Sequence, residues 1–224
     1  MPRTRIKICG VTRPRDAAAA ARAGADAMGM VFYPKARRCI SVERAREILR
    51  EVPAFVTPVG LFVDQDVEEV KRTAGALGLG HVQLHGHETP EMVRELAEFR
   101  VLKALRADRR TLEGELDLWR KAVNSLALVN LRGLVLETPG VGTGGTGVEN
   151  DWEFIAALQA AGVFAGLPPL IVAGGLTPAN VGAVVKLLQP YAVDVSSGVE
   201  EAFGEKSAAK IEAFMAEVAR VSHI

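Results

Sequence analysis

Two short apolar runs in the last third of the chain decide the predicted fold: Pro169-Leu170-Ile171-Val172-Ala173, followed by Gly174-Gly175, and Tyr191-Ala192-Val193-Asp194-Val195, followed by Ser196-Ser197-Gly198. Each run predicts a buried strand that ends in small residues. Glycine lets the backbone approach an oxyanion, and each end leads into a predicted helix start, where amides and the helix dipole attract a phosphate. The loops after strands seven and eight of a (β/α)8 barrel commonly bind phosphate, so this pattern predicts six earlier strand–helix units.

The chain upstream of these runs contains six further strand patterns, each followed by a helix pattern. The predicted strands cover residues 5–9, 27–32, 58–63, 81–85, 100–105 and 134–137. Helix starts are predicted at Thr12 with Pro14, Ser41, Asp66 with Glu69, Thr89 with Pro90, Asp151, and Thr177 with Pro178. Nearly continuous apolar strands are typical of a parallel sheet covered by helices. We therefore predict an α/β protein in which residues 1–224 form a single (β/α)8 TIM barrel domain with eight parallel strands; an open doubly wound sheet is the alternative.

The composition indicates a small ligand rather than a polymer or a membrane. The 224 residues are 49% hydrophobic, and 27 basic residues match 27 acidic ones. A chain without net charge has no overall field to attract nucleic acid or an anionic membrane. The N-terminus has no apolar leader and no apolar run reaches the length of a membrane span, so we expect a cytoplasmic protein. The predicted helices show no unpaired apolar stripe, so we expect a monomer, with a homodimer as the alternative.

Reactive side chains matter most at or near the end of a strand, because the active face of a (β/α)8 barrel lies at the carboxyl ends of its strands. The residues that meet this condition are Cys9, Arg38, Asp64, Gln83, His85, Glu137 and Asp194. The two cysteines, Cys9 and Cys39, have neither a disulfide framework nor metal-ligand spacing, and free thiols are expected.

Three of these residues have acid–base or nucleophilic chemistry, and each also has a structural interpretation. Cys9 precedes a glycine and a helix start that favour a thiolate, but a lone cysteine is also a common buried apolar residue. Glu137 ends an apolar strand, where desolvation raises the pKa of a carboxyl group toward that of a proton donor; the alternative is a carboxylate facing water. His85 is either an acid–base group or a hydrogen-bonded support of the site.

Two charged residues have binding interpretations. Arg38 lies in a basic loop, which is commonly a solvated surface, but on the active face a guanidinium can bind a substrate carboxylate in a bidentate manner. Asp194 is interpreted as buried and structural, because an anion would repel a nearby phosphate. The glycine-rich stretch Gly144-Gly145-Thr146-Gly147 lacks the pattern of a nucleotide P-loop, and a lid or a backbone contact to phosphate is expected instead.

An ordered set of segments runs along the chain: Lys7-Ile8-Cys9-Gly10, Phe32-Tyr33 through Arg38 to Ile40-Ser41, Val59-Gly60-Leu61-Phe62-Val63, Gln83-Leu84-His85-Gly86, Gly144-Gly145-Thr146-Gly147 with Asp151-Trp152, Ala173-Gly174-Gly175-Leu176, and Val193-Asp194-Val195-Ser196-Ser197-Gly198-Val199-Glu200. Each segment alone is a weak signal, and the specificity comes from their order. In combination, these segments resemble one family, phosphoribosylanthranilate isomerase, the (β/α)8 enzyme of tryptophan biosynthesis.

The resemblance implies an Amadori rearrangement of N-(5-phosphoribosyl)anthranilate without a metal or an organic cofactor. It implies that Glu137 stands where the family's acid protonates the ring oxygen, and that Cys9 is the base that removes the C2 proton. Arg38 would bind the anthranilate carboxylate, and His85 would belong to the substrate site. The implied phosphate site consists of Gly174, Gly175, Ser196, Ser197 and Gly198.

The chain departs from the family pattern at two positions. The family usually has aspartate where this chain has Glu137, and the additional methylene displaces the carboxyl group by about 1.5 Å, a shift that can cost about 100-fold in rate. Cys39 stands where the family often has an aromatic residue beside the anthranilate pocket. The alternatives are a catalytically weakened phosphosugar-binding barrel and a related sugar-phosphate isomerase; the related histidine-pathway enzyme resembles a two-aspartate type, which Cys9 disfavours.

Overall fold

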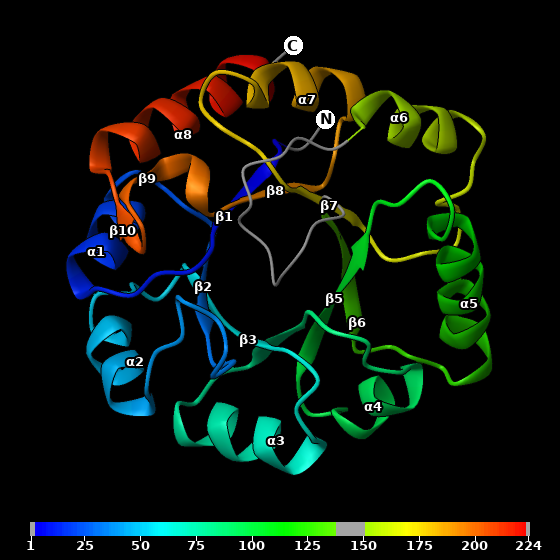
Figure 1. Cartoon of the computed structure of the whole chain (residues 1–224), viewed down its shortest axis with the longest axis horizontal. Helices are drawn as coiled ribbons and strands as arrows, with labels where there is room; N and C mark the ends of the chain where they lie inside the picture. Colours follow the sequence, from blue (N-terminus) through cyan, green and yellow to red (C-terminus); the bar gives the residue numbers. More distant parts are fainter. Residues whose placement is uncertain (1–2, 138–150, 223–224) are drawn as a thin grey trace.

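Eight parallel strands close into a barrel in the computed structural model, which describes residues 3–137 and 151–222 (Figure 1). The strands are β1 (Arg5–Ile8), β2 (Ala27–Val31), β3 (Thr57–Phe62), β4 (His81–Leu84), β5 (Arg100–Arg106), β6 (Leu131–Glu137), β7 (Leu170–Ala173) and β8 (Ala192–Val195). Each strand pairs with the next, and β1 pairs with β8 so that Lys7 lies opposite Asp194. The predicted closed (β/α)8 barrel is confirmed, and the open doubly wound sheet is excluded.

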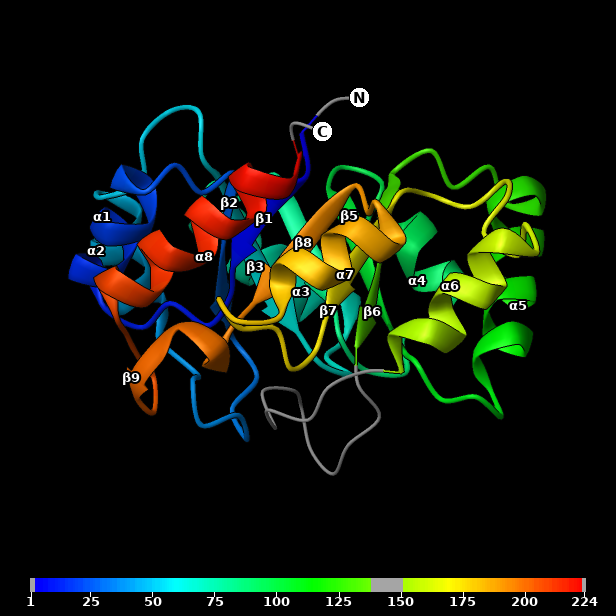
Figure 2. The same ribbon diagram turned by 90° about the horizontal axis from the view of Figure 1, so that it is seen from above.

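Helices surround the strand ring on its outside (Figure 1). They are α1 (Pro14–Arg22), α2 (Val42–Leu49), α3 (Val67–Ala76), α4 (Pro90–Glu95), α5 (Leu112–Ser125), α6 (Trp152–Ala160), α7 (Val181–Leu188) and α8 (Ala208–Ser222). Between β8 and α8 the chain forms a short 3-10 turn, η1 (Ser197–Val199), and an antiparallel pair, β9 (Glu200–Ala202) with β10 (Glu205–Lys206), here called the hairpin. Figure 2 shows the hairpin projecting beyond one end of the barrel. No helix in the described ranges is both long and apolar enough to cross a membrane.

The helix starts follow the prediction in four cases and differ in two, and in one of the four the Asp151 side chain accepts a hydrogen bond from the Phe154 amide at the start of α6. The side chains of Ser41, Asp66 and Thr89 each accept a hydrogen bond from the backbone amide three residues later. Thr12, however, does not cap α1, because its hydroxyl donates to the carbonyl oxygen of Gly204 in the hairpin at 2.6 Å. The helix expected at Thr177 begins only at Val181, after a turn in which the Asn180 side chain accepts from the Thr177 amide.

Successive side chains along a strand alternate between two environments, the core between the strands and the helices and the interior of the barrel. Ile6 and Ile8 of β1 belong to the main core between the strands and the helices, whereas Lys7 and Cys9 lie on the other face, inside the barrel. Apolar residues inside the barrel form two separate groups. One contains Cys9, Val31, Leu61 and Val63, and the other contains Ala104, Val135, Ile171, Ala173 and Ala192. Charged and amide side chains therefore share the barrel interior with these groups.

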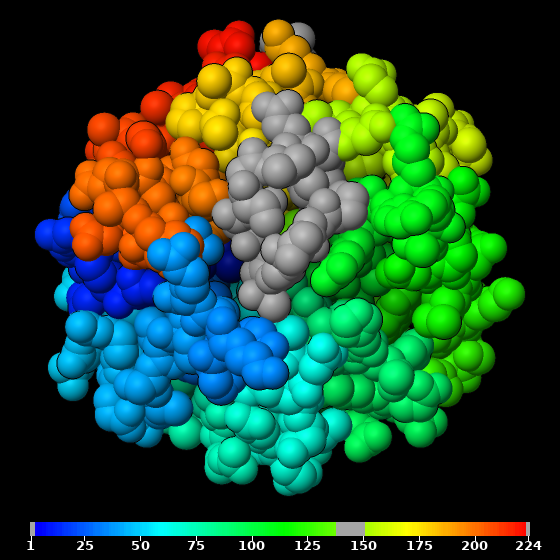
Figure 3. Space-filling model, in the orientation of Figure 1, coloured from blue at the N-terminus to red at the C-terminus, as the bar shows by residue number. Residues whose placement is uncertain are grey.

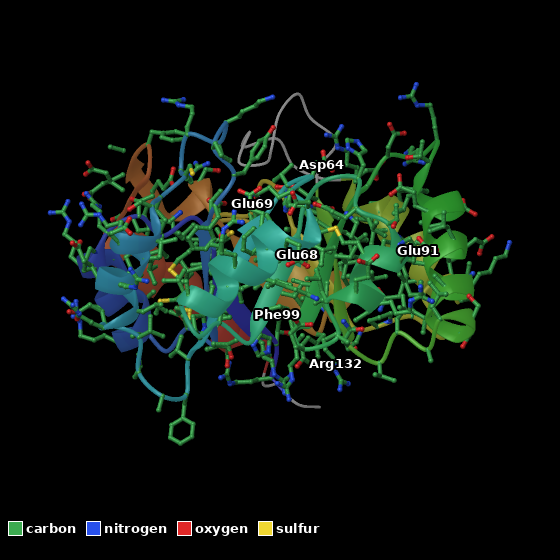
Figure 4. All side chains as sticks on the ribbon, turned by 90° about the horizontal axis from the view of Figure 1, so that it is seen from below. Asp64, Glu68, Glu69, Glu91, Phe99 and Arg132 are labelled. Carbon is green, nitrogen blue, oxygen red and sulfur yellow. The ribbon has the colours of Figure 1, made fainter. Side chains whose placement is uncertain are left out.

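The strand direction defines the two ends of the barrel. Figure 4 shows Asp64, which follows β3, near one end, and Phe99 and Arg132, which lie at the starts of β5 and β6, toward the other. The end marked by Asp64 is the carboxyl end of the strands. It is the end where the predicted site residues lie, because they follow the strands in sequence.

Candidate active site

Cys9 lies in a compact, buried group at the carboxyl end of β1. Lys7, two residues earlier on the same face, donates from Nζ to Oδ2 of Asp194 on β8 at 2.7 Å, and both of these side chains are buried. Gly29 on the neighbouring strand β2 leaves the necessary space, since a Cβ there would lie 2.8 Å from Cys9 Sγ and 3.1 Å from Lys7 Nζ. The strand register therefore brings a thiol, an ammonium group and a carboxylate together in the barrel interior.

The charges in this group act on Cys9 in opposite directions. Burial raises the pKa of the Cys9 thiol, and Asp194 adds to this effect, while Lys7 favours the thiolate and limits the rise. Burial alone would lower the pKa of Lys7, but Asp194 and Cys9 outweigh it and raise that pKa. Lys7 is thus held in its charged form beside Cys9, and among the neighbouring groups it opposes the rise in the Cys9 pKa most strongly.

Glu137 ends β6 and is hydrogen bonded to His85, which follows β4. Oε2 of Glu137 lies 2.5 Å from Nε2 of His85, and Nδ1 of His85 lies 2.9 Å from Nε2 of Gln83. The expectation that the pKa of Glu137 is raised overall is wrong. Burial does push that pKa upward, but the His85 hydrogen bond and the charges of His85, Lys7 and Arg106 together lower it.

A cavity of about 500 Å³ opens beside the His85–Glu137 pair. Tyr33, Val63 and Leu105 contribute apolar surface to it, and Arg106 contributes a cation. Lys7 acts electrostatically on both Cys9 and Glu137. The predicted base and the predicted acid position therefore belong to the same region of the barrel interior and share one buried ammonium group.

Arg38 lies in the loop after β2, where its guanidinium is already paired. Its Nε and Nη2 donate to the two carboxylate oxygens of Glu200 at 2.8 and 2.9 Å, and the Phe203 ring lies 4.2 Å from its Cζ. Lys206 is buried beside this pair and donates from Nζ to Oε1 of Glu200 at 3.0 Å. No local sequence pattern predicts a role for Glu200, Phe203 or Lys206.

The two predicted phosphate-binding segments are in contact. Gly174 and Gly175 both have positive φ, +90° and +64°, a conformation that favours glycine. A Cβ on Gly198 would lie 1.8 Å from the carbonyl oxygen of Leu176, so the segments after β7 and β8 pack backbone against backbone. The predicted helix start directly after Gly175 is absent, because α7 begins at Val181; backbone amides, rather than the dipole of α7, are the donors close to Gly175.

A comparison with known families decides the assignment. The model of the family described as "N-(5'phosphoribosyl)anthranilate (PRA) isomerase" matches residues 6–217. The chain belongs to this family.

Curated relatives and solved structures carry the same name over nearly the whole chain. N-(5'-phosphoribosyl)anthranilate isomerase of Pseudomonas aeruginosa is 45% identical over 216 residues, which is 96% of this chain and 95% of that protein. Phosphoribosyl anthranilate isomerase from Thermotoga maritima has a TM-score of 0.84 with 37% identity, covering 97% and 99% of the two chains. The structure of the isomerase in complex with reduced 1-(o-carboxyphenylamino)-1-deoxyribulose 5-phosphate has a TM-score of 0.81 with 36% identity, covering 97% and 99%.

Some predicted features of this isomerase chain lie apart from the acid–base groups or outside the described residues. Cys39 is half-buried, and its Sγ contacts the carbonyl oxygen of Ile40. Asp64 lines the cavity, but its carboxylate accepts a hydrogen bond from the His87 amide. The stretch Gly144-Gly145-Thr146-Gly147 falls outside the described residues. Within residues 3–137 and 151–222, no three histidine, cysteine or acidic side chains form a group that could hold a metal ion.

Lys7 and Gln83 are the functional candidates that sequence reasoning underestimated. A lysine between Ile6 and Ile8 in an apolar strand is an unusual charge, and two-residue alternation places it on the face of Cys9. That signal was available from the sequence. The interactions of Lys7 with Asp194 and Glu137 could not be predicted from the sequence, because strand register and barrel closure decide which strand ends meet.

Proposed function

We propose that this protein catalyses the Amadori rearrangement of N-(5-phosphoribosyl)anthranilate to 1-(2-carboxyphenylamino)-1-deoxyribulose 5-phosphate in tryptophan biosynthesis. Membership of the isomerase family over nearly the whole chain supports this function. The observation that carries the chemistry is the buried ammonium of Lys7, which acts on both Cys9 and Glu137 at the carboxyl end of the barrel. A base and an acid in one region meet the requirement of a reaction that protonates one atom and deprotonates another.

The acid step is assigned to the His85–Glu137 pair rather than to a lone carboxyl group. The hydrogen bond from His85 lowers the pKa of Glu137 and favours its ionised form, so the carboxyl group of Glu137 is a poor proton donor by itself. Gln83 suits both protonation states of His85: its amide nitrogen donates to neutral Nδ1, and after a 180° turn its oxygen accepts from protonated Nδ1. The pair then delivers the proton to the ring oxygen, the ring C–O bond breaks, and the nitrogen lone pair forms the Schiff base.

The base step is assigned to Cys9. Its thiolate removes the proton from C2 of the Schiff base, the C2–H electrons form the C1–C2 double bond, and the resulting enolamine ketonises. Lys7 stabilises the thiolate before the transfer, and its pair with Asp194 fixes the ammonium in place. The reaction needs no external oxidant or reductant, because the electrons lost at C2 are gained at C1 of the same molecule.

The two ends of the substrate are assigned to different segments around this centre. The phosphate would bind the glycine and serine groups after β7 and β8, where Gly174, Gly175 and Gly198 permit close backbone approach. Arg38 would bind the anthranilate carboxylate through the N–H groups that Glu200 does not use.

The proposed partner is this small phosphoribosyl molecule alone, with neither nucleic acid nor a membrane. Its proposed location is the cytoplasm, where free phosphorylated metabolites are made. The name of one structural neighbour, from Thermotoga maritima, describes mutually generated monomers of a dimeric isomerase. For this chain a monomer remains the prediction and a homodimer the alternative, and light scattering at assay concentration distinguishes them.

The test is the decay of anthranilate fluorescence with freshly prepared phosphoribosylanthranilate. We expect the wild type to turn over, and Cys9→Ser and Glu137→Gln each to lose about 100-fold or more in kcat. Cys39→Ser and Glu115→Gln are matched controls, since Cys39 is the other free cysteine, with its Sγ on the carbonyl oxygen of Ile40, and Glu115 lines the same cavity as Glu137. Equal losses in Cys9→Ser and Cys39→Ser would remove the role of Cys9.

A further variant tests the additional methylene at position 137. Glu137→Asp shortens the side chain that now reaches His85. If the wild type is active and Glu137→Asp is slower, the glutamate is adapted to this barrel. If only Glu137→Asp is active, the chain is a weakened relative, and if neither is active, the phosphosugar-binding alternative replaces the enzyme.

A further inference from the structure

The hairpin brings three side chains that the proposed mechanism does not use against the loop of Arg38. Glu200, Phe203 and Lys206 all contact Arg38 or its partner. Figure 3 shows the light blue segment after β2 lying against the orange segment that contains the hairpin. These segments are far apart in the sequence, so their contact is a feature of the folded barrel.

Glu200 occupies one edge of the Arg38 guanidinium and leaves another edge free to bind. The pairing uses the N–H of Nε and one N–H of Nη2. A guanidinium has five N–H groups, so three remain, and the two on the edge between Nη1 and Nη2 can bind a second carboxylate in the same plane. Both side chains are largely buried, with 11% of Arg38 and 7% of Glu200 exposed, so the pair is held in a single orientation.

Phe203 and Gly10 restrict Arg38 further. Cζ of Arg38 lies 4.2 Å from the centroid of the Phe203 ring, which Arg37 also approaches at 3.7 Å, so the ring gives the Arg38 guanidinium a cation–π contact. The Arg38 stem packs closely on Gly10, where a Cβ would lie 2.6 Å from Arg38 Cδ and 3.1 Å from Ser196 Oγ. Arg38 and Ser196 therefore both lie against the same glycine.

Lys206 connects the Arg38–Glu200 pair to the phosphate segment. Its fully buried side chain donates from Nζ to the carbonyl oxygen of Ser196 at 3.0 Å and to Glu200 Oε1 at 3.0 Å, and Ser196 Oγ lies 3.4 Å away. Three acceptors match the three protons of the ammonium group. Burial lowers the pKa of Lys206 and Glu200 opposes that shift. Arg38 and Lys206 together face the single carboxylate of Glu200, so the connected group favours an added anion.

We propose that the hairpin is a specificity element, in which Glu200 and Phe203 hold Arg38 in the orientation that recognises the substrate's aromatic carboxylate, and Lys206 anchors that arrangement to Ser196 in the phosphate segment. This inference rests on the proposed function, because it requires a substrate with a carboxylate at one end and a phosphate at the other. A pre-set guanidinium loses little rotational freedom when it binds, and its distance from the phosphate segment is fixed. Glu200 is thus a positioning residue that contacts Arg38 rather than the substrate.

The test compares phosphoribosylanthranilate with the phosphoribosyl adduct of aniline, which lacks the carboxylate. In Glu200→Gln we expect KM for phosphoribosylanthranilate to rise about 10- to 100-fold, because a charged hydrogen-bonded partner of Arg38 is lost. We expect kcat to change by less than about threefold, because the acid and base are untouched, and KM for the aniline adduct to stay near the wild-type value. Glu201→Gln is the matched control, since Glu201 is the next residue on β9 and is exposed.

Failure of the inference and failure of the proposed function give different results. If the wild type turns over neither compound, the proposed function is wrong. If the wild type is active and Glu200→Gln behaves like Glu201→Gln, or raises KM equally for both compounds, the hairpin is not a specificity element. Phe203→Leu leaves no buried charge unpaired, and we expect it to raise KM for phosphoribosylanthranilate alone by about two- to fivefold. If Glu200→Gln does not fold, an unchanged KM in Phe203→Leu overturns the inference.

Discussion

Lys7 is the residue on which the chemistry of this barrel depends most, because a buried thiol is a poor base without a nearby cation. Burial raises the pKa of Cys9, and among the neighbouring groups Lys7 opposes that rise most strongly. Asp194 has the opposite effect on Cys9 but keeps Lys7 charged. The pair therefore provides a fixed ammonium together with a nearby anion.

Removing this pair should make Cys9 harder to ionise. Lys7→Met alone would leave Asp194 buried without its cation, so the informative variant is Lys7→Met combined with Asp194→Asn. We expect its rate of Cys9 alkylation by iodoacetamide to rise only at higher pH than in the wild type, and kcat at pH 7 to fall at least about tenfold. The control is Cys39, whose alkylation in the same sample should follow the same pH dependence in both proteins. Unchanged reactivity of Cys9 would contradict the role of Lys7.

At the scale of elements, the contact between the segments after β7 and β8 depends on Gly198. A Cβ at this position would lie 1.8 Å from the carbonyl oxygen of Leu176, and a backbone atom cannot move aside as a side-chain end can. We expect Gly198→Ala to separate the two segments and to weaken inhibition by inorganic phosphate about tenfold or more, as measured by its inhibition constant against phosphoribosylanthranilate.

A glycine in open space is the control for this variant. Gly75 lies in α3, and a Cβ at this position would meet no neighbouring atom within 4 Å. Gly75→Ala should therefore leave phosphate inhibition unchanged and stabilise the protein by about 0.5–1 kcal/mol. Equal phosphate inhibition constants in Gly198→Ala and the wild type would show that phosphate does not bind at this contact.

The elements were predictable from sequence where their signals were local. Apolar runs predicted all eight barrel strands, and Ser41, Asp66 and Thr89 cap helices as expected. The prediction at Thr12 was wrong because its hydroxyl bonds Gly204, which is distant in the sequence. A tertiary partner overrides a local cap pattern when it offers the same hydrogen bond, and no sequence window contains that partner.

The candidate site was predictable in its positions and less so in its electrostatics. The position of Glu137 at the end of β6 followed from the strand pattern, but the direction of its pKa shift did not, because the hydrogen bond to His85 depends on how β4 and β6 lie across the barrel. Arg38 was assigned to the active face, yet its pairing with Glu200 required the hairpin to fold back over the loop after β2. The fold as a whole decides which buried charges pair, so the partner of a buried charged residue cannot be predicted from the local sequence.

For the whole molecule, closure of the barrel brings ionised carboxylates into buried positions. Glu137 on β6 and Glu200 in the hairpin both have a pKa below the ordinary value of 4.5, because burial is outweighed by His85 for Glu137 and by Arg38 and Lys206 for Glu200. A carboxyl group whose pKa is lowered in the folded state stabilises the protein above its unfolded pKa. That contribution is lost as the pH falls through the folded pKa.

Acid should therefore weaken the barrel, and Glu200→Gln isolates one contribution. We expect the wild-type melting temperature to fall as the pH is lowered from about 6 to below about 4, and the gap between the wild type and Glu200→Gln to narrow over the same range, since protonated Glu200 resembles glutamine. Each kcal/mol corresponds to about 2–4 °C for a chain of this size. Glu201→Gln should follow the wild-type curve, and a gap that stays constant with pH would mean that the pairing of Glu200 with Arg38 and Lys206 does not stabilise the fold.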